Sequence, residues 1–163
     1  MSATPSMPDT PAGPVTVQAP MERATPLVFA SPHSGRTYSK DLTRWTQVDQ
    51  AVLRRSEDAF VDELFADAPR FGAPLILARF PRVFVDANRA RDELDAGMFD
   101  PPYPAVAEGA AGSRAAAGLG VIPRLAADGR PLYQTRLPAS EARRRLDAYY
   151  APYHKTVRAQ LDA

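Results

Sequence analysis

The stretch Leu27-Val28-Phe29-Ala30-Ser31-Pro32-His33-Ser34-Gly35 decides how the rest of the sequence is interpreted. Its first four residues are a short apolar run, rich in β-branched and aromatic side chains, that predicts a buried strand. Pro, His, Ser and Gly end that strand. Ligands of open α/β sheets bind in the crevice beyond the carboxyl ends of the strands, and a neutral imidazole there suits metal binding or proton transfer. The alternative is that His33 is an exposed turn histidine.

Composition excludes several classes of protein. The 163 residues are 45% hydrophobic and 24% charged, which is typical of a soluble domain with a sizeable core. The net charge of +1 gives no reason to expect nucleic acid or an anionic membrane as partner. Cysteine is absent, which excludes disulfides and thiolate metal sites and favours a reducing compartment. Without an apolar span or a secretory signal, we expect a cytoplasmic protein.

The 17 prolines fall in groups and mark the domain boundary. The first 25 residues combine Pro with Ser, Thr, Ala and Gly, and such a segment cannot bury enough apolar surface to offset its ordering entropy. We therefore predict a disordered tail over residues 1–25 and one domain over residues 26–163. A second group, between Asp100 and Pro104, predicts a loop.

A long amphipathic helix is predicted from Thr46 or Asp49 to Ala68, where Pro69 follows. Its apolar stripe consists of Leu53, Phe60, Val61, Leu64 and Ala68. Glu57 falls near the centre of that stripe, and Asp58 falls on its edge. A buried carboxylate needs a charged partner or a metal. For Glu57 the alternative to a metal is a salt bridge to an arginine.

Two further apolar runs predict strands, at residues 74–78 and 83–86. Polar side chains follow the second run, with Asp86, Asn88 and Arg89 behind it and Arg79 and Arg82 just before it. Arginine forks hold carboxylates through paired, charge-assisted bonds, which suggests an anionic substrate. The alternative is a surface turn with solvated charges.

Alternation of these runs with amphipathic helices predicts an α/β fold. We expect a mixed, largely parallel sheet with helices on both faces, in which the strands around Val28, Ile76 and Val85 are adjacent.

The second half of the chain predicts a loop, a hairpin and a helix. Residues 90–118 are too long for a simple connection, and loops of this length are often lids or binding loops. Asp128-Gly129 between two β-prone runs is a hairpin signal. A helix should begin near Ser140 and kink or split at Pro152. His154 lies on the edge of its apolar face and is expected to be structural.

Six stretches occur in an order that resembles one known family. They are Ser31–Gly35, Glu57–Asp62, Pro81–Arg89, Glu93–Asp95, Gly120–Arg124 and Tyr150–His154. Together they resemble the N-formylglutamate amidohydrolase (N-formylglutamate deformylase) family over residues 26–163. The resemblance implies a fold like that of zinc-dependent carboxypeptidases and deacylases, the phosphorylase/hydrolase-like fold. It also implies hydrolysis of N-formyl-L-glutamate, a small acidic N-acyl amino acid, to formate and glutamate in histidine catabolism.

The resemblance also implies site residues. His33 and Glu57 match metal ligands, and the metal would be divalent, zinc with cobalt as an alternative. Asn88 and Arg89 match the substrate-carboxylate pair, to which Ser34 and Arg82 are added. Arg82 would also stabilise transition-state charge. The matching stretches do not clearly supply the catalytic base, for which the alternatives are a residue of the missing half and, as second choices, Asp58 and Asp86.

Family members continue beyond this point with a strand that carries an Asp-x-His-Ser motif. The resemblance therefore implies that the chain corresponds to the N-terminal part of a family member. The second metal histidine would be missing unless His154 replaced it, and activity would be low or absent. The rival hypothesis is a non-catalytic module that binds an anion or a partner protein. An incomplete sheet would leave an open edge, through which we expect homo-oligomers.

Overall fold

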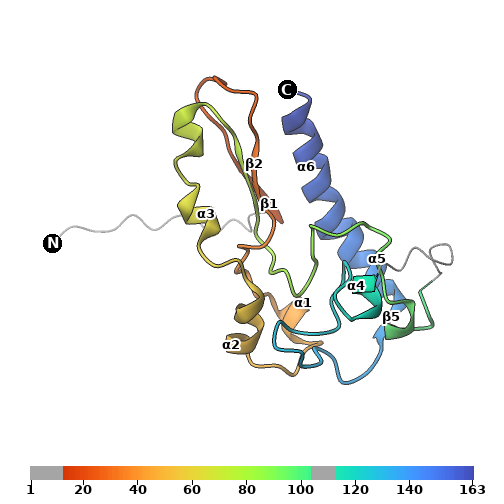
Figure 1. The fold of residues 1–163 in the computed structure, drawn as a ribbon. Coiled ribbons are helices and arrows are strands. Elements are labelled where there is room, and N and C mark those ends of the chain that lie inside the picture. The colour runs from red at the N-terminus through yellow and green to blue at the C-terminus, as the bar shows by residue number, and fades with distance from the viewer. Residues whose placement is uncertain (1–12, 104–112) are drawn as a thin grey trace.

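The computed structural model describes residues 13–103 and 113–163 and contains a three-stranded sheet (Figure 1). Its strands are β1 (Val15–Gln18), β2 (Phe29–Ser31) and β3 (Leu75–Ala78), in the order β1-β3-β2. β2 runs parallel to β3, with Ser31 opposite Leu77. β1 runs antiparallel to β3, with Val15 opposite Ala78. The sheet is therefore mixed, as the sequence predicts, but it is not largely parallel, because one of its two strand pairings is antiparallel.

The strand β1 corrects the prediction of a disordered tail over residues 1–25. Its Val-Thr-Val-Gln sequence has the β-branched side chains that favour a strand. The segment that follows is also fixed, because Arg23 Nη2 donates to the carbonyl of Gln160 at 2.7 Å and Ala24 N–H donates to the carbonyl of Gly72. Residues 1–12 of the predicted tail lie outside the described residues.

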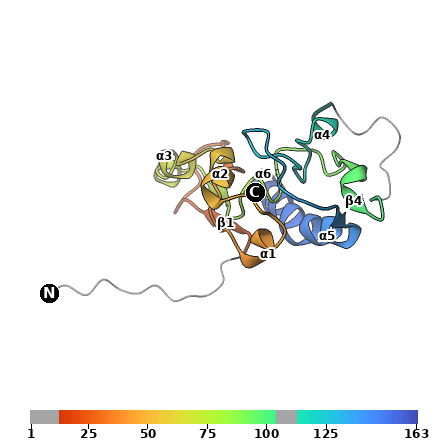
Figure 2. The same ribbon diagram turned by 90° about the horizontal axis from the view of Figure 1, so that it is seen from below.

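Helices cover both faces of the sheet, as predicted (Figures 1 and 2). The alternating side chains of β3 divide between two clusters. Ile76 and Ala78 belong to the main core, which includes Tyr153 of the C-terminal helix. Leu75 and Leu77 pack with Ala68 and Phe29 on the opposite face.

The long helix predicted from residue 46 or 49 to residue 68 is wrong, because short helical segments replace it. They are α2 (Gln50–Leu53), η1 (Arg54–Ser56), α3 (Val61–Leu64) and η2 (Ala68–Phe71). The backbone is extended at Glu57 and left-handed at Phe60, with φ of 65°. At this break Asp58 N–H donates to the carbonyl of His33 at 3.1 Å instead of to a helical partner. A tertiary hydrogen bond thus overrides the amphipathic pattern.

The predicted strand at residues 83–86 is also wrong, because this run forms a turn. Phe84 N–H donates to the carbonyl of Pro81, and Asp86 N–H donates to the carbonyl of Val121 at 2.8 Å. Val83, Phe84 and Val85 are nonetheless buried. The run is therefore in the core as expected, but it is not adjacent to β2 and β3 as a strand. Burial alone does not distinguish a strand from a buried turn.

The remaining elements are α1 (Lys40–Thr43), which precedes the broken helix, and those that follow residue 95 (Figure 2). The latter are η3 (Ala96–Met98), β4 (Phe99–Asp100), α4 (Ser113–Ala116), β5 (Leu137–Pro138), α5 (Ala139–Arg145), the π-helical turn η4 (Leu146–Tyr150) and α6 (Ala151–Leu161). β4 and β5 are parallel. The π turn immediately before Pro152 is the predicted interruption of the last helix. The predicted hairpin forms at Asp128-Gly129, with a bridge between Leu125 and Pro131 and Gly129 at φ of 82°. None of the helices in the described residues has the length and apolar character needed to cross a membrane.

We expect the edge strand β2 to promote self-association. In the described sheet only β3 pairs with β2, while Leu27 just before β2, Leu64 of α3 and Phe71 of η2 are more than half exposed. An open edge with exposed apolar side chains pairs readily with another chain. Sedimentation should therefore show concentration-dependent dimers. Ala30→Lys on β2 should weaken them, whereas Gln18→Lys on the other edge strand should not. A monomer at every concentration would contradict this expectation.

Candidate active site

His33 lies in the turn that follows β2, and its imidazole is buried with 5% of the residue exposed. The turn presses closely against the chain that leaves β3. Thr37 N–H donates to the carbonyl of Arg79 at 3.0 Å, and a Cβ at Gly35 would collide with the carbonyl oxygen of Phe80. The exposed-turn alternative for His33 is therefore wrong.

Both ring nitrogens of His33 face carboxylates. Nδ1 lies 3.1 Å from Asp58 Oδ2, and Nε2 lies 2.7 Å from Asp86 Oδ1. The Asp86 side chain is 4% exposed, whereas that of Asp58 is 49% exposed. A carboxylate only accepts hydrogen bonds, and a neutral imidazole has only one N–H to donate. With the ring N–H facing Asp86, the contact with Asp58 needs a further proton or a cation between Nδ1 and Oδ2.

Asp86 is the centre of a charge network at the end of the buried turn. Oδ2 accepts from Arg82 Nε at 3.1 Å and lies 3.7 Å from Arg89 Nε. Oδ1 also accepts from Asn88 N–H at 3.0 Å. Burial tends to raise the pKa of Asp86, but the hydrogen bond and charge of His33, with Arg82 and the Asn88 amide, hold it below the ordinary value. Asp86 is therefore an ionised group that orients His33.

We expect the stability of the fold in acid to depend on Asp86. A carboxyl whose pKa is lower in the folded chain than its ordinary value of 3.8 stabilises the fold above that value. The contribution is lost as the pH falls through the folded pKa. Asp86→Asn should therefore be less stable than the wild type at neutral pH, and the difference should shrink below about pH 4. Urea unfolding at several pH values measures this difference, and one that is independent of pH would contradict it.

The expected convergence of Glu57 and His33 is wrong. Glu57 Oε1 accepts from the Tyr38 hydroxyl at 2.7 Å and lies 3.4 Å from Arg54 Nε. Burial and the neighbouring Glu57 raise the pKa of Tyr38, which keeps this hydroxyl a donor. Because the helix breaks at Glu57, the next residue, Asp58, faces His33. The Glu57 carboxylate is buried as expected, and its contact with Arg54 corresponds to the salt-bridge alternative.

The other predicted residues divide between the site and its support. The Ser34 hydroxyl donates to the carbonyl of Asp58 at 3.0 Å and accepts from Asp62 N–H, so it fixes the backbone that carries Asp58. Asn88 contributes its backbone N–H to Asp86, but the residue itself is exposed. Arg82 and Arg89 line the pocket beside His33. The structure thus brings Arg82, Arg89 and Asp58 together in the pocket lining. Ser34 does not line this pocket and instead supports the backbone of Asp58.

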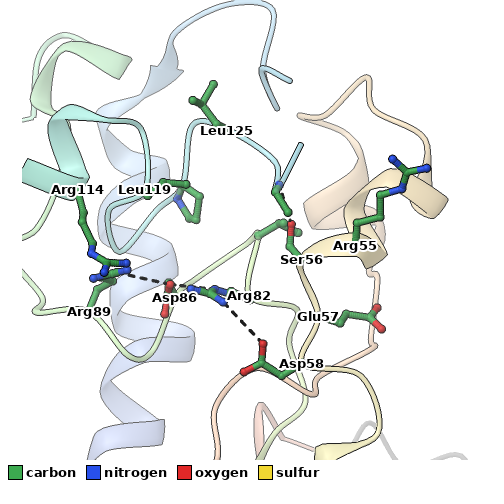
Figure 3. A pocket seen from close by; sticks show the side chains of 13 residues that line it. Arg55, Ser56, Glu57, Asp58, Arg82, Asp86, Arg89, Arg114, Leu119 and Leu125 are labelled. Carbon is green, nitrogen blue, oxygen red and sulfur yellow. Dashed lines mark hydrogen bonds and ion pairs between the residues drawn. The ribbon is translucent and has the colours of Figure 1, made fainter. Parts of the chain in front are cut away.

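A pocket of about 270 Å³ opens beside these groups (Figure 3). Its charged lining residues are Arg55, Glu57, Asp58, Arg82, Asp86, Arg89 and Arg114. Sequence reasoning missed Arg55 and Arg114. Arg114 lies in the segment 90–118, whose length predicted a lid or binding loop. That length was the one feature of the sequence that could have pointed to Arg114 as a pocket residue. Residues 104–112 of the same segment lie outside the described residues.

Comparison with known proteins identifies the family. The family model for N-formylglutamate amidohydrolase matches residues 25–163. The chain belongs to this family. It is 31% identical over 139 residues to the N-formylglutamate deformylase of Pseudomonas putida and 29% identical over 138 residues to that of Pseudomonas aeruginosa. These alignments cover 84% and 83% of this chain but 45% of each relative, so the chain spans about half their length.

A solved structure of the family supports the fold. The crystal structure of the N-formylglutamate amidohydrolase from Ralstonia eutropha JMP134 superposes with a TM-score of 0.83 at 36% sequence identity. The match covers 93% of this chain and 52% of that chain. The mixed α/β arrangement described above is therefore that of the N-formylglutamate amidohydrolase family over the shared region.

The donors around His33 suit a divalent metal in part. Nδ1 of His33 and Oδ2 of Asp58 are separated by 3.1 Å, close to the spacing of about 3.4 Å between two donors bound at about 2.1 Å to a tetrahedral zinc. Asp86 on Nε2 is the carboxylate that typically orients a zinc-binding histidine. However, the described residues contain no group of three His, Cys, Asp or Glu side chains that could hold a metal. His154 does not complete the set, because its Nε2 lies 3.0 Å from the carbonyl oxygen of Ala87.

Proposed function

We propose that this chain carries part of the active site of a metal-dependent hydrolase that cleaves the formyl amide of N-formyl-L-glutamate. The reaction adds water across the amide C–N bond and gives formate and glutamate. The observation that carries the proposal is the imidazole of His33, held between the buried Asp86 and the pocket-facing Asp58. Membership of the N-formylglutamate amidohydrolase family supports the reaction and the acidic substrate.

In this proposal the cofactor is zinc, with cobalt as the alternative, and His33 with Asp58 would hold it. The metal would lower the pKa of water and polarise the formyl oxygen. Asp86 would keep the Nε2 proton of His33 in place, so that the Nδ1 lone pair faces the metal. The chain would then correspond to the N-terminal part of a carboxypeptidase-like deacylase domain, with the third ligand supplied from elsewhere.

Arg82 is the residue we assign to transition-state charge. Its Nε donates to Asp86 at 3.1 Å, and its Nη1 lies 3.8 Å from Asp58 Oδ1, which fixes the guanidinium at the pocket wall. Its remaining N–H groups can stabilise the oxygen that becomes negative when water adds to the formyl carbon. Asp86 is unsuited to act as base because both of its oxygens already accept hydrogen bonds.

The test combines metal analysis with an assay of formate release. Purified chain is dialysed against zinc or cobalt, its metal content is measured, and it is incubated with N-formyl-L-glutamate. The proposal expects metal that is lost in His33→Ala, and formate release that needs the metal. Absence of both in a folded chain would overturn the proposal and would favour the non-catalytic anion-binding module.

A further inference from the structure

Two arginines of the pocket lining, Arg89 and Arg114, keep N–H groups that no described residue accepts from. Arg114, from α4, and Arg89 line the same pocket, and their guanidinium groups overlap in the view of Figure 3. Arg89 Nε is buried and has no hydrogen-bond acceptor among the described residues, and its nearest acid, Asp86 Oδ2, is 3.7 Å away. Within the part of the chain that the structure describes, Arg114 makes no hydrogen bond or ion pair. Two like charges on the lining of one pocket repel each other, and a bound anion reduces this repulsion.

Backbone contacts hold the two arginines in this position. Asp86 N–H donates to the carbonyl of Val121, and Val121 N–H donates to the carbonyl of Glu93, both at 2.8 Å. A Cβ at Gly120 would collide with the carbonyl oxygen of Glu93, so the two segments touch backbone to backbone. Leu119 N–H donates to the carbonyl of Arg114 at 2.7 Å. The segment carrying Arg114 is therefore fixed to the segment carrying Arg89.

The nearby acids give Arg89 only the 3.7 Å ion pair with Asp86 and give Arg114 no partner among the described residues. The oxygens of Asp86 accept from His33, Arg82 and the Asn88 amide. Asp58 faces His33 and Arg82, on the other side of Arg82 and Asp86 from the arginine pair (Figure 3). The Glu57 carboxylate accepts a hydrogen bond from the Tyr38 hydroxyl and forms an ion pair with Arg54. The pocket thus has a positive end, at Arg89 and Arg114, that is separate from the end where His33 and Asp58 meet.

We propose that Arg114 is a specificity-determining residue, which together with Arg89 binds the side-chain carboxylate of the substrate. This inference rests on the proposed function, because it takes the formyl group to lie at the His33 and Asp58 end. A planar carboxylate accepts parallel N–H bonds from guanidinium groups and cancels their repulsion. The pocket would then select acyl amino acids with a second carboxylate and reject their neutral amides, which leave the guanidinium charges unpaired.

The test uses ligands without a formyl amide, so that binding is measured apart from hydrolysis. Calorimetry measures the affinity of the chain for L-glutamate and for its neutral isostere L-glutamine. Arg114→Gln should weaken L-glutamate binding by about tenfold to a hundredfold and should leave L-glutamine binding nearly unchanged. Arg114→Lys, which keeps the charge but loses the fork, should fall between Arg114→Gln and the wild type.

Arg136→Gln is the matched control, because Arg136 is exposed and lies outside the pocket lining. It should leave both affinities unchanged. Equal losses for both ligands in Arg114→Gln, no loss for either, or no L-glutamate binding by the wild type would each overturn the assignment of Arg114. Formate release is measured separately. A wild type that binds L-glutamate through Arg114 but neither binds metal nor releases formate supports the arginine pair and contradicts the hydrolase. Formate release with the same KM in Arg114→Gln contradicts the pair alone.

Discussion

Glu141→Gln should lower the free energy of unfolding by about 3 to 5 kcal/mol, the cost of breaking a buried ion pair by removing one partner. Arg145 is fully buried, and its Nε donates to Glu141 Oε1 at 2.8 Å. Its other contacts are neutral: the Tyr133 hydroxyl at 2.9 Å and the Phe84 carbonyl at 3.4 Å. Its Nη2 already has no acceptor among the described residues. Loss of the Glu141 charge would leave a guanidinium without a counter-ion in the core.

Substitution of the other partner of the ion pair, Arg145, should lower the free energy of unfolding by less. In Arg145→Met, Glu141 keeps its two bonds from Arg144, both at 2.9 Å, so its charge stays compensated. The methionine would also fill apolar space beside the Phe84 ring, which Arg145 now covers at 4.2 Å. The double variant Glu141→Gln with Arg145→Met should therefore be more stable than Glu141→Gln alone.

Urea unfolding midpoints at constant m-value measure these differences. Glu63→Gln is the control, because Glu63 pairs with Arg36 on the surface with 63% of its side chain exposed. Its effect should be near zero. Equal losses in Glu141→Gln and Glu63→Gln would contradict the prediction.

The Glu141–Arg145 ion pair also supports the candidate site. Arg145 contacts both the carbonyl and the ring of Phe84, two residues before Asp86. The turn that presents Asp86 to His33 is thus anchored on α5. No signal in the sequence pairs Glu141 with Arg145 specifically, beyond their i,i+4 spacing on a predicted helix. Their burial follows from the packing of α5 against this turn, which is a tertiary feature.

Local patterns predicted the parts of the fold that local forces determine. The strands near Phe29 and Ile76, the Asp128-Gly129 turn and the interruption before Pro152 each depend on a few consecutive residues. Proline and glycine chemistry or apolar runs define them without reference to distant segments. For the same reason, His33 could be placed at the end of a strand from its own neighbours.

The errors arose where distant segments supply the hydrogen bonds. The helix breaks at Glu57 because Asp58 N–H bonds to His33, and Ser34 bonds to both Asp58 and Asp62. The run ending at Asp86 turns because its partner is Val121 and not a neighbouring strand. Helical periodicity alone predicted that Glu57 is the acid nearest the centre of the apolar stripe. Because the helix breaks there, the acid that faces His33 is instead the next residue, Asp58. A period calculation cannot foresee such a break.

The last prediction separates Asp58 from Glu57 as the acid that holds a metal. If the donors are His33 Nδ1 and Asp58, zinc affinity should fall by at least about tenfold in Asp58→Asn and in His33→Ala. Asp86→Asn should lower it by about 10- to 100-fold, the usual effect of losing a carboxylate that orients a histidine ligand. Competition against a fluorescent zinc indicator measures all three.

Glu57→Gln is the matched control, because it removes the same charge from the neighbouring position. The Tyr38 hydroxyl can still donate to the amide oxygen of the substituted side chain, since only an acceptor is needed there. Zinc affinity should therefore stay within about twofold of the wild type, as for a substitution that removes no ligand. If Glu57→Gln instead abolishes zinc binding while Asp58→Asn does not, the carboxylates must exchange places when metal binds, and the arrangement around His33 described above is not the metal-binding one.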